Sequence, residues 1–154
     1  MKRILFLGVG NLHRADDGVG PALADMLTAD AAFMAKGIEV QPHSGEGASL
    51  IHLWMGADKV VIVDAMKSGL RCGTIKRFDA AHEALHHGVF RYSSHLFSLA
   101  EAVEMSRTLG TLPPEMIVYG IEGKEFTFGA AMSPSVVRAL KKVEATVRDE
   151  FADL

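Results

Sequence analysis

The chain has 154 residues, the size of one domain, and its 49% hydrophobic and 23% charged residues are typical of a folded globular protein. The formal net charge of −3 excludes the basic excess with which proteins bind nucleic acids or anionic membrane surfaces. No apolar stretch reaches the roughly 18 residues that a membrane-spanning helix needs. We therefore expect one domain over residues 1–154, without a nucleic-acid or membrane partner.

The first half of the chain alternates between strand and helix patterns. The apolar run KRILFLGV predicts a buried strand over residues 2–9. Apolar residues at helical spacing predict a helix over residues 17–33, with Asp16 or Asp17 as its cap. A weaker strand over residues 37–43 and a short helix over residues 48–55 follow.

The second half continues the alternation. KVVIVDAM, residues 59–66, has four consecutive β-branched residues and predicts a central parallel strand. Residues 73–79 alternate in polarity and predict an edge strand, and the polar, His-rich residues 80–92 predict a loop.

Three further elements complete the chain. Ser93 or Ser94 is the expected cap of a helix that ends at Gly110, and residues 115–122 predict another buried strand. Ser133 is the expected cap of a terminal helix that starts at Pro134. This alternation predicts a single-domain α/β three-layer sandwich, with a mostly parallel twisted sheet of about five strands and helices on both faces.

Polar residues follow the strands at the edge where α/β sheets bind ligands. The first strand leads to Asn11, Asp16 and Asp17, the central strand ends at Asp64, and the strand over residues 115–122 ends at Glu122. His95 lies at the expected start of a helix, which opens on the same edge. Asp17, Asp64 and His95 are therefore candidates to meet, and two carboxylates with one imidazole form a set that binds a divalent transition metal.

Each of these residues also has a structural interpretation. In this interpretation Asp17 is only a helix cap, Asp64 caps the next turn, His95 is exposed, and Glu122 is an ordinary loop carboxylate. The glycines around Asp16 and Asp17 do not indicate a dinucleotide site, because His13 stands where the GxGxxG fingerprint requires glycine. Cys72 is the only cysteine, so no intrachain disulfide forms, which suits a cytoplasmic protein.

The segments LGVGNLHRADDGVG, VVIVDAM and SSHLFSL, in this order, resemble the hydrogenase maturation endopeptidases. These enzymes trim the C-terminus of the large subunit of [NiFe]-hydrogenases, and the resemblance runs from residue 3 to about residue 148. It implies that Asp17, Asp64 and His95 are catalytic residues that contact nickel. It also implies that this nickel is carried by the hydrogenase precursor, which is the partner, and that no organic cofactor is needed.

Two departures from the family pattern concern loops. Residues 44–49 read SGEGAS, where the family often has Gly-Gly-Thr, and Gly123 follows GIE, where the family often has proline. We keep Asn11, Asp16, Glu46 and Glu122 as substrate-binding candidates. The activity implied is a cytoplasmic, monomeric endopeptidase of the aspartic or metal-dependent type. The alternative is a non-enzymatic nickel-sensing or chaperone-like protein that binds the same precursor.

Overall fold

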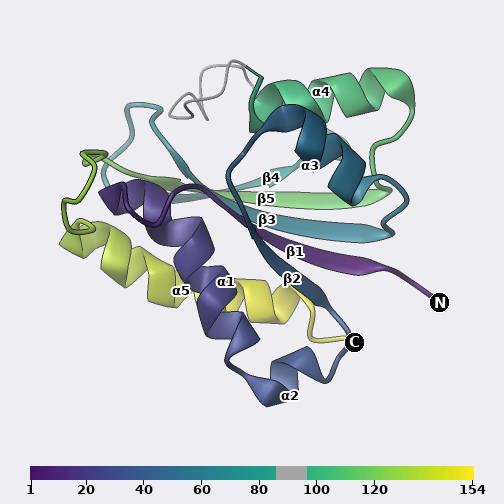
Figure 1. The fold of residues 1–154 in the computed structure, drawn as a ribbon, viewed down its shortest axis with the longest axis horizontal. Helices are drawn as coiled ribbons and strands as arrows, with labels where there is room; N and C mark the ends of the chain where they lie inside the picture. Colours follow the sequence, from purple (N-terminus) through teal and green to yellow (C-terminus); the bar gives the residue numbers. More distant parts are fainter. Residues whose placement is uncertain (86–96) are drawn as a thin grey trace.

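The structure, a computed structural model, describes residues 1–85 and 97–154 (Figure 1). Its strands are β1 (Ile4–Val9), β2 (Glu39–His43), β3 (Lys59–Met66), β4 (Ile75–Asp79) and β5 (Glu115–Glu122). They form one sheet in the order β2-β1-β3-β5-β4, in which only β4 is antiparallel to its neighbour. The mostly parallel sheet with β4 at its edge confirms the predicted fold class.

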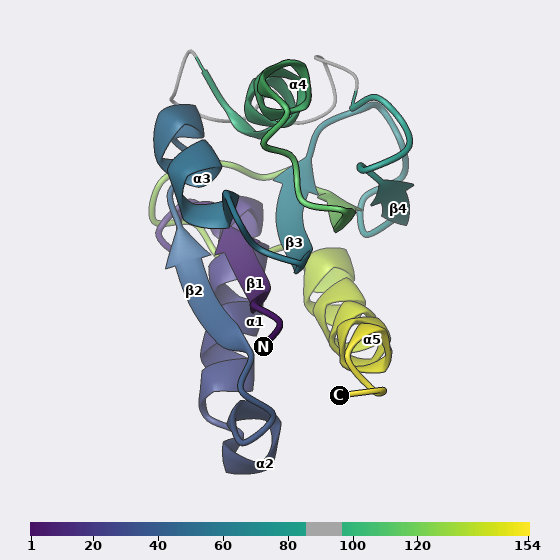
Figure 2. The same ribbon diagram turned by 90° about the vertical axis from the view of Figure 1, so that its right-hand side faces the viewer.

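Helices cover both faces of this sheet, as Figure 2 shows from the side. The helical elements are η1 (Ala15–Gly18), α1 (Val19–Thr28), α2 (Ala31–Met34), α3 (Gly47–Trp54), α4 (Leu99–Leu109) and α5 (Pro134–Glu150). Helices α1 and α5 lie on one face, and α3 and α4 lie on the other (Figures 1 and 2). The molecule is therefore the expected three-layer sandwich.

Strand β1 shows why the sheet is apolar throughout. All six of its residues are buried, because neighbouring side chains point to opposite faces and both faces are covered. Phe6 packs in the cluster beneath α1 and α5, whereas Leu5 and Leu7 pack in the cluster beneath α3 and α4. The continuous apolar run in the sequence therefore reflects two cores, one on each side of the sheet.

Three helix predictions need correction. The helix expected over residues 17–33 is split, because Asp30 accepts hydrogen bonds from the N–H groups of Ala32 and Phe33 and starts α2 as a new helix. Neither Asp16 nor Asp17 caps α1, whose cap position is Gly18. Ser133 occupies the predicted cap position of α5, but its hydroxyl donates to Asp16 and makes no cap hydrogen bond to the helix.

The predicted loop over residues 80–92 is described only up to residue 85, where Ala80–Glu83 form a turn. The expected caps Ser93 and Ser94 lie outside the described residues, and in the described part α4 begins at Leu99. Among residues 1–85 and 97–154, no helix has the length and apolar character that crossing a membrane requires.

Candidate functional site

A sharp turn after β1 brings the acidic segment, Asp16 and Asp17 in η1, back to the end of the strand. Gly10 has a φ of +136°, and a Cβ atom placed there would lie 2.0 Å from the carbonyl oxygen of Asp17. Its N–H donates to the carbonyl oxygen of His43, at the end of β2 (2.9 Å). Only glycine fits this position, because both the backbone conformation and the available space exclude a side chain.

Close packing of the first turn of α1 then fixes the acidic segment against the sheet. A Cβ atom on Gly20 would lie 2.4 Å from the carbonyl oxygen of Val9 and 2.5 Å from that of Val63. A Cβ atom on Gly8 would lie 2.1 Å from the carbonyl oxygen of Gly20. The glycines therefore let the start of α1 touch the backbone of β1 and β3, directly beside Asp64.

The carboxylates of Asp17 and Asp64 form the acidic centre of this edge. Both residues are buried, with 7% of the surface of each exposed. Asp17 Oδ2 accepts a hydrogen bond from the N–H of Asn11 (3.0 Å). Burial raises the pKa of Asp17, against the opposing effects of this hydrogen bond and of the positive charge on Arg14.

The pKa of Asp64 is raised well above its ordinary value. Burial is the larger cause, and the negative charge of Asp17 is the second. The N–H of Ala65 opposes both effects. The structure therefore brings together two of the three predicted site residues, in an arrangement where ionising both carboxylates is unfavourable unless a cation approaches.

The third predicted residue, His95, lies outside the described residues. Within residues 1–85 and 97–154, no group of three or more His, Cys, Asp or Glu side chains is placed to hold a metal ion. The described part of the site thus contributes a carboxylate pair alone. A role for His95 beside this pair stays a prediction.

Asp16, although adjacent to Asp17, is a structural residue. It is fully buried, and Oδ2 accepts hydrogen bonds from the N–H groups of Lys124 and Glu125 (both 2.9 Å). The N–H and hydroxyl of Ser133 donate to its two oxygens at 2.7 and 2.8 Å. With four protein donors on its carboxylate, Asp16 is not a substrate contact as the sequence suggested; it ties η1 to the segment between β5 and α5.

Glu122 has a similar structural role on the other side of this edge. It is 3% exposed, and its carboxylate accepts hydrogen bonds from the hydroxyl and N–H of Ser68 and from the N–H of Gly69. The side chain therefore holds the loop that follows β3, rather than facing a substrate. Gly123, the departure from the family pattern, packs against Asp16: a Cβ atom there would lie 2.8 Å from the Cβ of Asp16.

The remaining substrate-binding candidates lie nearer the surface. Asn11 is exposed, and its side-chain oxygen accepts a hydrogen bond from the N–H of His13 (2.9 Å). Glu46 is half-buried and caps α3, accepting hydrogen bonds from the N–H groups of Ala48 and Ser49 (both 2.9 Å). The cap explains the Glu46 side chain in structural terms, whereas Asn11 remains available to a partner at the edge beside Asp17.

His43 organises the glycine-rich turn before α3. Its Nδ1 accepts a hydrogen bond from the N–H of Gly45 (2.9 Å), so this nitrogen carries no proton, and Nε2 lies 3.0 Å from the hydroxyl oxygen of Ser49. The N–H of Gly47 donates to the carbonyl oxygen of Phe97 (2.9 Å). The SGEGAS segment is thus joined to the chain just after residues 86–96.

Comparison with known proteins assigns the chain to a family. A family model described as hydrogenase maturation protease matches residues 44–150. The chain belongs to the hydrogenase maturation protease family. A putative hydrogenase maturation protease of Methanocaldococcus jannaschii is 30% identical over 155 residues, covering 97% of each chain.

Other members of the hydrogenase maturation protease family are longer or more distant. The hydrogenase expression/formation protein HupD of Thiocapsa roseopersicina is 28% identical over 134 residues, which cover 86% of this chain and 60% of HupD. The first curated relatives are matched over only 60–64% of their length.

Solved structures of hydrogenase maturation proteases share the fold. The hydrogenase maturating endopeptidase HybD from Escherichia coli superposes with a TM-score of 0.72 at 21% identity, covering 96% of this chain and 93% of HybD. The [NiFe] hydrogenase maturation protease HybD from Thermococcus kodakarensis gives a TM-score of 0.70 at 24% identity, covering 96% and 97%. At these identities the likeness is one of fold.

Proposed function

We propose that this protein is a cytoplasmic endopeptidase that removes the C-terminal extension from the nickel-loaded precursor of a [NiFe]-hydrogenase large subunit. Family membership supports the reaction class. The observation that carries the proposal is the buried carboxylate pair of Asp17 and Asp64, at the edge of the sheet where α/β proteins bind their ligands. We expect the protein to act as a monomer that meets its precursor transiently.

The electrostatics of the carboxylate pair support recognition of a metal carried by the substrate. Two buried like charges repel each other, so a divalent cation that approaches them favours the ionised form of both. Nickel in the precursor supplies that cation, and an imidazole is a suitable further ligand. We propose that Asp17, Asp64 and His95 contact this nickel, which makes cleavage depend on nickel insertion.

The scissile peptide bond must then lie close to the nickel. A bound divalent metal polarises a carbonyl or lowers the pKa of a bound water, and either effect assists hydrolysis. The chain contributes orientation: the N–H of Asn11 holds Asp17, and the exposed side chain of Asn11 is positioned to contact the precursor next to it. The described residues therefore bind and position, while the precursor brings the metal.

The test is the processing of a C-terminally extended large subunit, followed by intact-mass spectrometry. We expect Asp17→Asn, Asp64→Asn and His95→Ala each to reduce the processing rate by at least about 100-fold. Asp25→Asn, on the exposed side of α1, is the matched control and should process at the wild-type rate. Wild-type rates for all three site variants would overturn the proposed site. A stable complex with an unprocessed precursor would instead support a non-enzymatic binding partner.

A further inference from the structure

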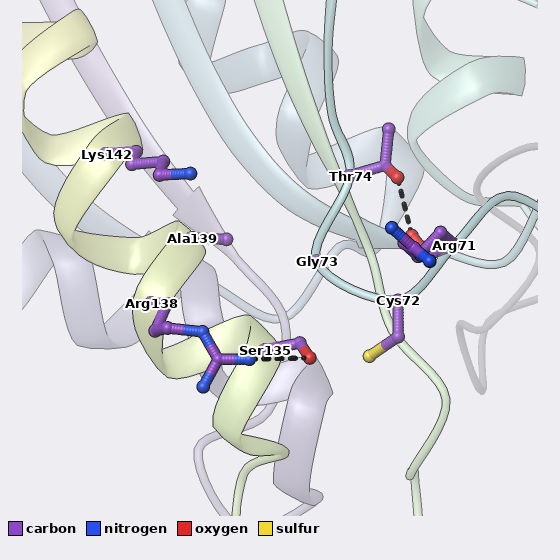
Figure 3. A pocket seen from close by; sticks show the side chains of 8 residues that line it. All are labelled: Arg71, Cys72, Gly73, Thr74, Ser135, Arg138, Ala139 and Lys142. Carbon is purple, nitrogen blue, oxygen red and sulfur yellow. Dashed lines mark hydrogen bonds between the residues drawn. The ribbon is translucent and has the colours of Figure 1, made fainter.

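A second feature of the same edge is a pocket of about 250 Å³ between the turn that leads into β4 and the first turns of α5 (Figure 3). Its lining residues are Arg71, Cys72, Gly73, Thr74, Ser135, Arg138, Ala139 and Lys142. They come from two segments about 60 residues apart in the sequence. None of them belongs to the carboxylate site described above.

The pocket is strongly cationic. Arg71, Arg138 and Lys142 contribute three positive charges, and no carboxylate lines the pocket. Among residues 1–85 and 97–154, the one side-chain hydrogen bond of these three is the contact of Arg138 with the hydroxyl oxygen of Ser135 (3.2 Å), and none of the three forms an ion pair.

Four other arginines of the described chain contrast with this cluster. Arg3, Arg77, Arg107 and Arg148 each pair with a glutamate or aspartate within 3.1 Å. Like charges gathered without a counter-ion repel one another and favour the approach of an anion. The N-terminal end of the 17-residue helix α5 adds positive potential at the same place.

Buried carboxylates hold both walls of the pocket. On the turn side, Glu122 binds Ser68 and Gly69 through its side chain, and its carbonyl oxygen accepts the N–H of Gly73 (2.7 Å). On the helix side, Asp16 binds the N–H and hydroxyl of Ser133, immediately before α5. The cations are therefore mounted on two fixed segments, which lowers the cost of ordering them around a ligand.

The available donors favour a carboxylate over a phosphate. Phosphate sites commonly use a cradle of free backbone N–H groups. Here the N–H of Gly73 donates to Glu122 and that of Thr74 donates to the carbonyl oxygen of Arg71 (3.0 Å). Side-chain cations are the main donors. The planar guanidinium of Arg138 can bind two oxygens of either anion, so the preference for a carboxylate rests on the missing cradle of backbone N–H groups.

We propose that the pocket formed by Arg71, Arg138 and Lys142 binds a carboxylate of the hydrogenase precursor and anchors that polypeptide beside the Asp17–Asp64 pair. The identity of the polypeptide rests on the proposed function, whereas binding of the carboxylate does not. Asp16 and Glu122 connect the pocket to the Asp17–Asp64 pair. Asp16 directly precedes Asp17 in the sequence and binds Ser133 at the start of α5, and Asp16 and Glu122 lie at the same edge of the sheet. The pocket would thus add charge recognition to the recognition of nickel.

Nuclear magnetic resonance titration of the full chain tests the binding step. The probes are an acetylated and amidated tri-glutamate peptide, the matching tri-glutamine peptide, and inorganic phosphate. We expect tri-glutamate to shift the amide signals of residues 71–74 and 135–142, with an affinity that falls as salt is added. Tri-glutamine should leave them unchanged, and phosphate should bind more weakly than tri-glutamate.

Variants on α5 provide the matched comparison. Arg138→Ala combined with Lys142→Ala should weaken tri-glutamate binding by about tenfold or more, which is about 1.4 kcal/mol. Lys141→Ala removes an exposed lysine of the same helix that does not line the pocket, and it should change the affinity by less than about twofold. Three results would overturn the carboxylate site. They are an equal loss of tri-glutamate affinity in the double variant and in Lys141→Ala, amide shifts of the same size with tri-glutamine, and amide shifts with phosphate alone.

The single cysteine gives an independent measurement. The thiol of Cys72 points from the turn toward α5 in Figure 3, and Cys72 is half-buried. A negatively charged thiol reagent should modify it several-fold faster than a positively charged reagent of the same size, and tri-glutamate should slow the modification. Lys142→Ala should reduce the preference for the anionic reagent more than Lys141→Ala does. No preference for the anionic reagent would contradict a cationic pocket.

Precursor processing then tests the link to the substrate. The Arg138→Ala, Lys142→Ala protein should show a KM raised several-fold with kcat nearly unchanged, because the pocket lies outside the reacting groups. If the pocket binds tri-glutamate but the variant has the wild-type KM, the assignment to the precursor is wrong. If the wild type binds tri-glutamate but never cleaves, the proposed function fails and the carboxylate site stands.

Discussion

Asp16 and Asp17 are neighbours in the sequence, but their carboxylates have opposite environments. Asp16 accepts four hydrogen bonds from Lys124, Glu125 and Ser133 and is fully buried. Among the described residues, Asp17 accepts one from the N–H of Asn11, and its charge raises the pKa of Asp64. The first acid is therefore part of the scaffold, and the second is part of the candidate site.

This difference predicts opposite effects on stability. Asp16→Asn should lower the free energy of unfolding by about 2–4 kcal/mol, because the amide group places a donor against N–H and O–H donors. Asp17→Asn should cost little or be stabilising, since burial already disfavours the charge of Asp17. Denaturant unfolding of both variants is the measurement. Similar losses in the two proteins would contradict the assigned roles.

The raised pKa of Asp64 predicts that the difference in stability between the wild type and Asp64→Asn depends on pH. Its pKa is higher in the folded protein than the ordinary 3.8, so ionising Asp64 costs folding free energy. The wild type therefore loses stability relative to Asp64→Asn as the pH rises through the pKa of Asp64 in the folded protein. Below about pH 4 the two proteins should have similar free energies of unfolding. At neutral pH the variant should be about 0.5–2 kcal/mol more stable.

Thermal unfolding between acid and neutral pH measures this difference. Asp25→Asn, at an exposed position of α1, should follow the wild type throughout. An Asp64→Asn protein that is less stable than the wild type at neutral pH would show that Asp64 is held as a stabilising anion, contrary to its raised pKa.

The close packing around Gly20 predicts that a larger residue does not fit at the start of α1. Gly20→Ala places a Cβ atom 2.4–2.6 Å from backbone atoms of Val9 and Val63, so α1 must move away from the sheet. We expect a loss of about 3 kcal/mol or more in unfolding free energy, together with loss of processing. Gly56→Ala is the control, because its Cβ meets nothing within 4 Å and the φ of +84° alone costs about 1 kcal/mol. Equal losses would contradict the close packing.

The environment of Tyr119 predicts that its hydroxyl group resists ionisation. Burial and the hydrogen bond from its hydroxyl to Glu150 raise its pKa to about 12. The absorbance of the tyrosinate near 295 nm, measured in the wild type and in Tyr119→Phe, isolates this group. At about pH 11 the two folded proteins should show the same tyrosinate absorbance. A wild-type excess of one tyrosinate at that pH would contradict the assignment.

The sequence predicted Asp17 and Asp64 because Asp17 follows the apolar strand β1 and Asp64 lies near the end of the apolar strand β3, and the ends of parallel strands meet at one edge. It could not separate Asp16 and Glu122 from the site, because their donors lie far away in the chain: 108–117 residues for Asp16 and 53–54 residues for Glu122.

The cationic pocket left no pattern in the sequence for a related reason. Its charges come from an exposed turn and from ordinary surface positions of α5, and only the folded chain brings Arg71 near Arg138. The split between α1 and α2 was similarly hidden, because the apolar spacing continues past Asp30 while the Asp30 side chain starts a new helix. The position of His95 beside the acids stays a prediction.

The most direct test of the account compares nickel-loaded and nickel-free precursors of one extended large subunit. Each is incubated with this protein, and its intact mass is measured. The account predicts the loss of one C-terminal peptide from the nickel-loaded precursor, no loss from the nickel-free precursor, and no loss from either with Asp17→Asn. Cleavage of the nickel-free precursor at the same rate, or full activity of Asp17→Asn, would contradict recognition of nickel by the Asp17–Asp64 pair.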